Sequence, residues 1–304
     1  MGKDLIIVDW GTTGFRAWLV DEKGGVKDEI PSGIGMRDLP RERFPGYCGE
    51  QVARWRSGGE QPPIFMAGMV GAPQGWQAAP QPILPIGLDD LATQVVAAEG
   101  LADTWIIPGC RVQRSQSEID VMRGEEVQIF GALELLGCRD ALFCLPGTHS
   151  KWAETKDGTL THFTTSMTGE VYQVMLAHSI LGKTADANAP FSPAAFRLGL
   201  DQARRDGGVL HHMFTTRCRA LYGDLAPETT PSYLSGLLIG SELRSMRILY
   251  PKAKDVVVVA GHALTEPYRI ALAATGFSTR SVSAKDASLT GIRAVVNRRR
   301  ACIA

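Results

Sequence analysis

Short apolar runs alternate with amphipathic stretches along the first part of the chain. The runs Leu5 to Val8, Ile64 to Met66 and Trp105 to Ile107 have the length and composition of buried strands. The stretch 88–99, between the last two runs, is amphipathic with a helical period. Strands that alternate with helices are typical of α/β proteins, so the pattern predicts this fold class.

This plan occurs twice in the sequence. In each copy a buried strand ends in a Gly-Thr loop, a second strand follows, and a glycine turn leads into a third strand. The first copy begins at Leu5 and the second at Ala141. The repeat predicts two α/β lobes, over residues 1–137 and 138–304, whose loops can face each other across a cleft.

Further helices are expected around these two copies. The stretch 124–136 predicts a helix that leads from the first lobe into the second, at the natural hinge. A closing helix, within 287–304, is expected to pack near that hinge. The second lobe should also contain one buried strand and several helices, at 256–259, 169–181, 231–248 and 263–276. The region 183–231 is rich in Pro, Ala and Asp and has no pattern that assigns it.

Composition excludes several classes of function. The chain has 304 residues, 44% of them hydrophobic, and its 32 basic residues balance 32 acidic ones, so no net field draws it to nucleic acid or to an anionic membrane. The basic run 298–300 stands alone and is expected to be a solvated helix end. Six scattered cysteines form no CxxC pair, which argues against a zinc, iron-sulfur or disulfide framework and favours reduced thiols in the cytoplasm.

The segment from Asp9 to Arg16 has the residues of a phosphate-binding loop. It runs Asp-Trp-Gly-Thr-Thr-Gly-Phe-Arg directly after the first apolar strand. The backbone N–H of Gly11 and the hydroxyls of Thr12 and Thr13 can bind phosphate oxygens, and a carboxylate at the end of a strand can hold Mg²⁺ through water. Arg16 would add a fixed cation. The alternative is an ordinary hairpin turn in which Asp9 is a turn acceptor.

Two later segments extend this interpretation to a whole nucleotide. The second copy carries Leu-Pro-Gly-Thr-His-Ser-Lys at 145–151, so Gly147, Thr148 and Ser150 can form a second phosphate loop. The apolar strand before Gly261 and His262 ends in a glycine turn that would admit adenosine close to the backbone. Taken alone, either segment could be an ordinary turn; their order after the first loop is what favours nucleotide binding.

At this point the chain resembles a known family. The order of the two loops, the connecting helix, the late strand-Gly turn and the closing helix is similar to the sugar-kinase branch of the actin, hexokinase and Hsp70 ATPase superfamily, whose lobes are ribonuclease H-like. Within that branch the chain resembles the 2-dehydro-3-deoxygalactonokinases. The motifs that carry this resemblance lie at 9–18, 123–126, 145–152, 167–170 and 235–242.

The resemblance implies a specific reaction. It is the ATP-dependent phosphorylation of 2-dehydro-3-deoxy-D-galactonate at the 6-hydroxyl, giving 2-dehydro-3-deoxy-6-phosphogalactonate and ADP, with Mg²⁺, in galactonate catabolism. The enzyme would be cytoplasmic, with small-molecule substrates, no nucleic-acid or membrane partner, and a homodimer as a further expectation. The alternatives are a kinase for another sugar or sugar acid, a phosphatase, and a non-catalytic actin-like ATP switch.

The catalytic base is where the chain departs from the wider pattern. Sugar kinases of this superfamily commonly place an aspartate near the start of the connecting helix, whereas this chain has Glu125 and Glu126 there. Adjacent helical residues point about 100° apart, so we expect only one of them, Glu125 first, to face the substrate. The helix N-terminus should lower the pKa of either carboxyl. Asp120 is the third candidate.

The sugar pocket is expected to use glycine and arginine. Gly35 would admit close approach of the substrate, and Arg37 could pair with its carboxylate. Arg123 competes for that role, as do Arg111 and Arg114, and a plain loop at 32–37 remains an alternative. Thr168 is expected to cap a helix in preference to contacting a ligand.

Overall fold

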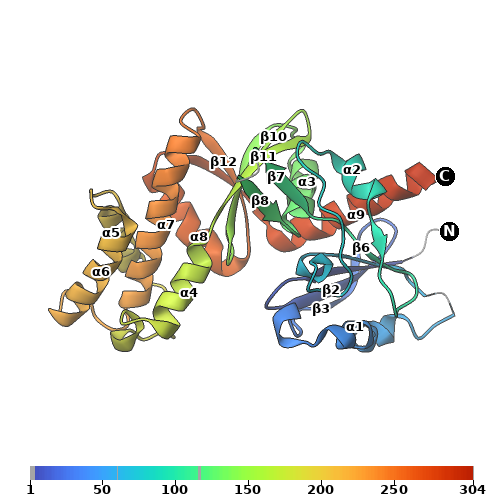
Figure 1. Cartoon of the computed structure of the whole chain (residues 1–304), viewed down its shortest axis with the longest axis horizontal. Coiled ribbons are helices and arrows are strands. Elements are labelled where there is room, and N and C mark those ends of the chain that lie inside the picture. The colour runs from blue at the N-terminus through green and yellow to red at the C-terminus, as the bar shows by residue number, and fades with distance from the viewer. Residues whose placement is uncertain (1–3, 60, 116–117, 304) are drawn as a thin grey trace. The chain divides into compact units, whose positions relative to one another are not determined.

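The computed structural model describes residues 4–59, 61–115 and 118–303, and its internal contacts divide the chain into two units. Unit 1 comprises residues 1–140, 154–163 and 284–304, and unit 2 comprises 141–153 and 164–283 (Figure 1). The division expected at residue 137 therefore differs from this grouping chiefly in two segments. Residues 154–163 and 284–304 belong with unit 1.

Unit 1 is built on a six-stranded sheet with the order β3-β2-β1-β4-β6-β5. The central strand β1 is antiparallel to β2 and parallel to β4, and most of its side chains are buried because strands cover it on both edges. The strands are β1 (Leu5–Trp10), β2 (Phe15–Val20), β3 (Val26–Ile30), β4 (Ile64–Ala67), β5 (Val96–Ala97) and β6 (Thr104–Ile106). The parallel pairing places the carboxyl ends of β1 and β4 at one edge of this sheet.

Aromatic side chains fill the core beside that edge. Trp10 is fully buried and contacts the rings of Phe15, Phe44, Tyr47 and Trp76 at centroid distances between 4.9 and 6.3 Å. Its indole Nε1 donates to Ile34 O at 3.1 Å. The end of β1 is therefore fixed both by packing and by a hydrogen bond to the loop that follows β3.

The other elements of unit 1 are short, apart from two helices. They are α1 (Phe44–Val52), α2 (Leu88–Thr93), the hairpin of β7 (Cys110–Gln113) and β8 (Ile119–Met122), α3 (Glu125–Leu136), α9 (Ala284–Ile303) and four 3-10 turns at 36–38, 41–43, 53–55 and 69–71. The stretch 88–99 is helical only in α2. Val96 and Ala97 leave the helical period because they pair with β6 as strand β5.

Helix α9 joins unit 1 by crossing α3 at very short range. A Cβ on Gly131 would lie 2.0 Å from Ala287 O, and one on Gly291 would lie 1.8 Å from Val127 O. Only glycine permits this approach of the two backbones. In Figure 1, α9 (red) accordingly lies along α3 (green), although the two are far apart in the sequence.

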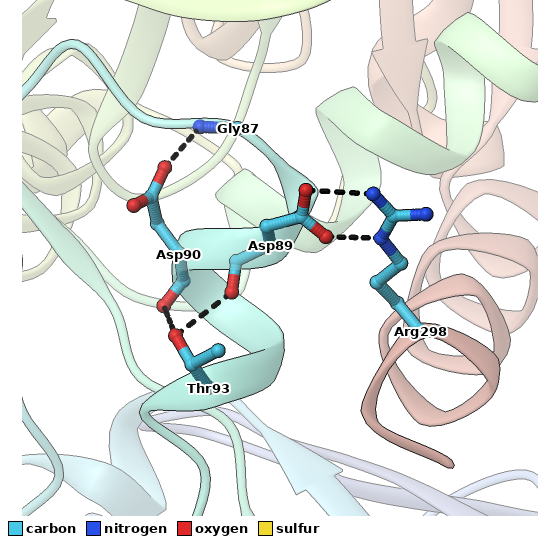
Figure 2. Close-up of polar contacts among 5 residues, drawn as sticks. All are labelled: Gly87, Asp89, Asp90, Thr93 and Arg298. Atoms are coloured by element: carbon cyan, nitrogen blue, oxygen red, sulfur yellow. Dashed lines mark hydrogen bonds and ion pairs between the residues drawn. The ribbon is translucent and has the colours of Figure 1, made fainter. Parts of the chain in front are cut away.

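Helix α2 is also tied to α9, as Figure 2 shows. Asp90 accepts a hydrogen bond from Gly87 N at 2.7 Å, which caps the start of α2, and Arg298 Nη2 donates to Asp89 Oδ2 at 2.7 Å. Arg299 lies over the ring of Trp105, with 4.6 Å to the centroid. The basic run 298–300 is thus not simply solvated: two of its arginines bind other elements of unit 1.

Unit 2 is built on a five-stranded sheet with the order β11-β10-β9-β12-β13. Its strands are β9 (Ala141–Leu145), β10 (Ser150–Lys156), β11 (Thr159–Ser166), β12 (Asp255–Ala260) and β13 (Ser278–Ser283), and the far ends of β10 and β11 form the segment 154–163 that groups with unit 1. Strand β12 is parallel to both β9 and β13. The carboxyl ends of β9 and β12 therefore meet at one edge.

Five α-helices and a 3-10 turn at 182–184 complete the described part of unit 2. The α-helices are α4 (Thr168–His178), α5 (Pro193–Ala203), α6 (Gly208–Leu221), α7 (Thr230–Leu249) and α8 (His262–Ala274). The long helix α7 packs against the other four, and its side chains contribute to the core around Trp152, Phe196 and Tyr268. The unassigned region 183–231 contains α5 and α6. In the described residues we find no helix with the length and apolar character needed to cross a membrane.

Candidate active site

Loop 1 is the turn 11–14 between β1 and β2. Gly11 N donates to Gly14 O at 2.9 Å, and the side chains of Thr12 and Thr13 are exposed. Asp9 and Arg16 are opposite each other in the β1–β2 ladder, and Arg16 Nη2 contacts Asp9 Oδ2 at 2.7 Å. Arg16 thus lies at the same end of this hairpin as Asp9, Gly11, Thr12 and Thr13, the residues of the first lobe predicted to bind phosphate and metal.

The segment 33–37 holds loop 1 in place from behind. Met36 N donates to Gly11 O at 3.1 Å and Arg37 N to Thr12 O at 3.0 Å. A Cβ on Gly35 would lie 2.3 Å from the carbonyl carbon of Thr13, so the two backbones touch. Gly35 therefore supports loop 1. The Arg37 side chain, 65% exposed, pairs with Asp38 at 3.3 Å.

The first turn of α3 begins beside the end of β1. A Cβ on Gly68, which follows β4, would lie 2.6 Å from Trp10 O, and a Cβ on Gly124 would lie 3.2 Å from Gly68 Cα. Three backbone segments are therefore stacked at this edge. Consequently Glu125 and Glu126 start their helix close to the strand end that carries Asp9.

The two glutamates at the start of α3 occupy different environments. Glu126 is 1% exposed, and both of its carboxylate oxygens accept from Gly124 N, at 2.9 and 2.8 Å. Burial, with a contribution from the Glu125 charge, raises the pKa of Glu126 to about 8. The expected lowering by the helix N-terminus is thus wrong for this residue, because loss of hydration outweighs the backbone hydrogen bonds. Glu125 is only partly buried and accepts from Arg123 N at 3.2 Å.

The other predicted residues of unit 1, Asp120 and Arg123, lie on strand β8 and directly after it. Asp120 lies on strand β8, opposite Val112, and accepts from Val121 N at 2.8 Å. Arg123 Nη2 donates to Ala79 O at 2.8 Å, and its other terminal nitrogen is buried. The guanidinium of Arg123 is therefore held inside the fold, whereas that of Arg37 pairs with Asp38 at the surface.

Asp9 has the chemistry required of a magnesium ligand. Its side chain is 14% exposed; burial raises its pKa, and the Arg16 charge opposes this shift. The described residues contain no group of three or more His, Cys, Asp or Glu side chains that could hold a metal by themselves. Magnesium in phosphoryl-transfer sites commonly uses one or two carboxylates together with water and phosphate oxygens, and a single strand-end carboxylate fits that pattern.

Loop 2 is the turn 146–149 between β9 and β10, and it rests on the first turn of α4. Glu170 N donates to Thr148 O at 2.9 Å, and a Cβ on Gly169 would lie 2.3 Å from Gly147 O. Thr148 and His149 are exposed, and His149 Nε2 contacts Glu170 Oε2 at 2.5 Å. Loop 2 therefore lies at the N-terminus of α4, where the helix dipole favours an anion.

Ser150, the first residue after loop 2, was predicted to bind phosphate, but its hydroxyl is directed inward. It is fully buried and donates to Glu242 Oε1 at 2.8 Å. Glu242 also accepts from Trp152 Nε1 at 2.7 Å, from Tyr268 OH at 2.9 Å and from the Thr168 hydroxyl. Thr168 was expected to cap α4, but the N-cap position belongs to Met167 and Thr168 is the first residue of the helix.

Glu242 is the residue of the site that sequence reasoning missed. It lies within the family-like motif 235–242 but received no role there. The signal available was a single carboxylate in the apolar part of helix α7, between Ser241 and Leu243. A charge in that position requires hydrogen-bond partners, yet those partners come from segments far away in the sequence and could not be named from it.

A cavity of about 280 Å³ adjoins loop 2 within unit 2. Gly147, Thr168 and Gly169 line the side next to the loop, and the other walls come from α4, α7, α8 and the segment before α5. Apolar and aromatic side chains dominate those walls, among them Tyr172, Phe191, Leu238, Leu264 and Pro267. The predicted adenosine residues Gly261 and His262 are exposed at the start of α8, and the wall itself begins with the next residue, Ala263.

The chain matches known proteins over nearly its whole length. Residues 9–295 match the model of the 2-keto-3-deoxy-galactonokinase family. The chain is 34% identical over 292 residues to the 2-dehydro-3-deoxygalactonokinase of Escherichia coli (strain K12), which covers 96% of this chain and 97% of that protein. It is 35% identical over 292 residues to a Rhizobium meliloti (strain 1021) protein named as a probable enzyme of the same kind, covering 94% of each.

Solved structures show the same relation. A Sinorhizobium meliloti protein provisionally named a 2-dehydro-3-deoxygalactonokinase superposes with a TM-score of 0.88 and 32% identity, covering 96% of this chain and 98% of that one. An activator of 2-hydroxyisocaproyl-CoA dehydratase from Clostridium difficile, with ADPNP bound, reaches a TM-score of 0.53 at 11% identity, over 99% and 97% of the two chains, and shows a shared fold alone. The expected actin-like α/β fold is confirmed, and the chain belongs to the 2-keto-3-deoxy-galactonokinase family.

Proposed function

We propose that this protein transfers the γ-phosphoryl group of ATP to the 6-hydroxyl of 2-dehydro-3-deoxy-D-galactonate. The products are 2-dehydro-3-deoxy-6-phosphogalactonate and ADP. Membership of the family supports the acceptor. The structural observation that carries the proposal is the apolar cavity of unit 2, which adjoins a glycine-threonine loop at a helix N-terminus. An apolar pocket beside a site for anions suits a purine nucleotide.

In unit 2, we assign the adenosine to the cavity and its phosphates to loop 2. The backbone at Gly147 and the hydroxyl of Thr148 would contact phosphate oxygens, and the first turn of α4 would stabilise their charge. Gly261 and His262 precede the cavity wall and would limit its entrance. Ser150 acts from behind the loop, since its hydroxyl is already bonded inside the fold.

In unit 1, we assign loop 1 to the transferring end of ATP. Gly11, Thr12 and Thr13 would bind phosphate oxygens, and the exposed guanidinium of Arg16 would offset negative charge in the transition state. Asp9 would hold hydrated Mg²⁺, which when bound neutralises phosphate charge. Phosphoryl transfer depends chiefly on such positioning and charge neutralisation, so these groups are the core of the catalytic machinery.

Glu125 is the carboxylate best suited to accept the proton of the attacking hydroxyl. A general base must be deprotonated at working pH. The pKa of Glu126, raised to about 8 by burial, leaves that residue largely protonated at pH 7, and its oxygens are already used by Gly124 N. Glu125 is partly exposed. Asp120 on β8 remains the third candidate.

For the carboxylate of the sugar acid we assign Arg37. Its guanidinium is exposed and pairs with the neighbouring Asp38, whereas that of Arg123 is bound to Ala79 O. Gly35 would contribute by holding loop 1, on which the acceptor must be aligned.

We also place the enzyme in the cytoplasm, where its six free thiols would stay reduced. A homodimer stays a prediction, which sedimentation would test.

The decisive experiment measures ATP turnover with and without a panel of sugar acids. A kinase should consume ATP at a rate that depends strongly on the acceptor, with 2-dehydro-3-deoxy-D-galactonate giving the highest kcat/KM. Turnover at the same rate without any acceptor would indicate a phosphatase or an ATP switch. A higher kcat/KM for a different sugar acid would keep the kinase and replace the substrate.

A further inference from the structure

Glu242 gathers four hydrogen-bond donors from three other elements of unit 2. Ser150 and Trp152 come from β10, Thr168 from α4 and Tyr268 from α8, while Glu242 itself comes from α7. The carboxylate is 5% exposed. An ionised carboxylate only accepts hydrogen bonds, so three hydroxyl protons and one indole proton are all directed at it.

These donors are distributed around the proposed nucleotide site. Ser150 is the residue directly after loop 2, and Thr168 begins the helix turn on which loop 2 rests. Thr168 and Tyr268 also line the cavity, next to the loop and in the α8 wall respectively. One buried side chain is thus bonded to the phosphate end and to the adenosine end of the same site.

A contribution to stability alone does not account for this residue. Burying a carboxylate costs hydration that its hydrogen bonds repay only in part, and an apolar residue of similar volume often serves a core equally well. Desolvation accordingly raises the pKa of Glu242, against the effect of its four donors. A polar group kept here at that cost, with four hydrogen bonds to other elements, fixes the relative placement of the elements that it joins.

We propose that Glu242 is a positioning residue for the nucleotide, which holds loop 2, the first turn of α4 and the α8 wall in the arrangement that binds ATP. This inference rests on the proposed function in one respect, namely that a nucleotide is the ligand of the cavity. Glu242 itself need not touch the ligand, because it acts through Ser150, Thr168 and Tyr268.

The Glu242→Gln variant separates positioning from simple packing. The amide oxygen can still accept from Ser150 and Trp152, but the amide nitrogen donates, so the hydroxyls of Thr168 and Tyr268 must turn their protons elsewhere. Side-chain volume is almost unchanged. We expect the KM for ATP and the Kd for ADP to rise about tenfold or more, with the KM for the sugar acid within about twofold of wild type.

The experiment compares Glu242→Gln with Glu266→Gln, which changes an exposed carboxylate of α8 that pairs with Arg269. ADP binding is measured by calorimetry, both KM values by steady-state kinetics, and folding by the thermal midpoint. Glu266→Gln should match wild type throughout. If Glu242→Gln fails to fold, Tyr268→Phe and Ser150→Ala, which each remove one donor, should still raise the Kd for ADP about threefold.

The outcomes separate this inference from the proposed function. Wild-type protein that binds no ADP would refute the proposed nucleotide site. Wild-type binding together with unchanged ADP affinity in the folded Glu242→Gln variant, or in both single-donor variants, would refute the positioning role and leave the kinase intact. Equal increases in the two KM values would also refute it, because a general loosening of the fold would not act on the nucleotide alone.

Discussion

Loop 1 and loop 2 have similar sequences but different surroundings. Both follow a buried strand, both contain Gly-Thr, and a glycine of another segment supports each from behind: a Cβ on Gly35 in unit 1 or on Gly169 in unit 2 would lie 2.3 Å from loop backbone. Loop 1, however, begins after a carboxylate that is paired with an arginine across the hairpin. Loop 2 follows Leu145, begins with Pro146 and adjoins an apolar cavity.

This difference matches the roles proposed above for the two loops in one reaction. The loop geometry is kept, while the residue at the strand end is acidic in one unit and apolar in the other. We infer that unit 1 supplies the charged groups of phosphoryl transfer, and that unit 2 supplies the shape and anion contacts that hold the nucleotide. Substitutions in the two loops should therefore affect different kinetic constants.

The largest effect is expected for Asp9→Asn. The change keeps the shape of the side chain and removes the charge proposed to hold Mg²⁺, so kcat should fall by roughly 10² or more, a barrier increase of about 2.7 kcal/mol. The thermal midpoint should stay close to that of wild type. The control is Glu22→Gln, which changes an exposed carboxylate in the turn after β2. Turnover within threefold of wild type in Asp9→Asn would remove the main distinction between the loops.

Next in size is the loss of the proposed base. Glu125→Gln should lower kcat by roughly 10-fold to 100-fold, because general-base assistance is smaller than charge neutralisation in this chemistry. The matched variant Glu126→Gln should retain near-normal kcat at pH 7, since its amide resembles the protonated acid. Should both variants turn over normally, the base lies elsewhere and Asp120→Asn becomes the variant to measure.

The two supporting glycines give a matched pair of steric tests. Gly35→Ala and Gly169→Ala each force a methyl group against loop backbone at 2.3 Å, so the loop must shift. We expect Gly169→Ala to raise the KM for ATP about tenfold, whereas Gly35→Ala should mainly lower kcat, by a similar factor. Identical kinetic defects in the two variants would contradict the proposed division of work.

A smaller effect, on stability, is expected at the buried glutamate of unit 1. The folded protein holds the pKa of Glu126 near 8, above the usual 4.5. Between those values the folded state binds more protons than the unfolded state, so wild-type stability falls as pH rises toward 8. Glu126→Gln lacks this loss and should melt several degrees higher than wild type at pH 9, but at the same temperature at pH 5. Parallel melting curves across that range would show that Glu126 is not the titrating group.

The smallest effect is expected for the exposed ion pair of loop 2. His149 and Glu170 lie 2.5 Å apart but are 48% and 41% exposed, and such pairs are typically worth less than about 1 kcal/mol. His149→Ala should change kcat and the KM for ATP by less than threefold. A loss approaching that of Asp9→Asn would instead make this histidine a functional counterpart of the charged pair in loop 1.

The sequence was sufficient for features determined locally. A second strand was predicted after the first Gly-Thr loop and is observed as β2, and α3 begins one residue after its predicted start, because alternation, apolar runs and glycine turns act over a few residues. The helices α5 and α6 were not found, since the composition of 183–231 gives no clear period. The partners of Glu242 and the burial of Glu126 depend on segments far apart in the chain, and no local pattern specifies them.

The crossing of α3 and α9 has a consequence for the way the chain is made. Residues 284–304 leave the ribosome after all of unit 2. Unit 1 nevertheless needs them, because they cover α3 and because Arg298 binds Asp89 of α2. The N-terminal part of unit 1, which is synthesised first, therefore cannot complete its packing until residues 284–304 have been made, and the apolar side of α3 stays uncovered until then. Most of unit 2 can fold as soon as it has left the ribosome. Synthesis order and folding order are thus inverted, and the nascent N-terminal part is the stage at which chaperone protection would matter most.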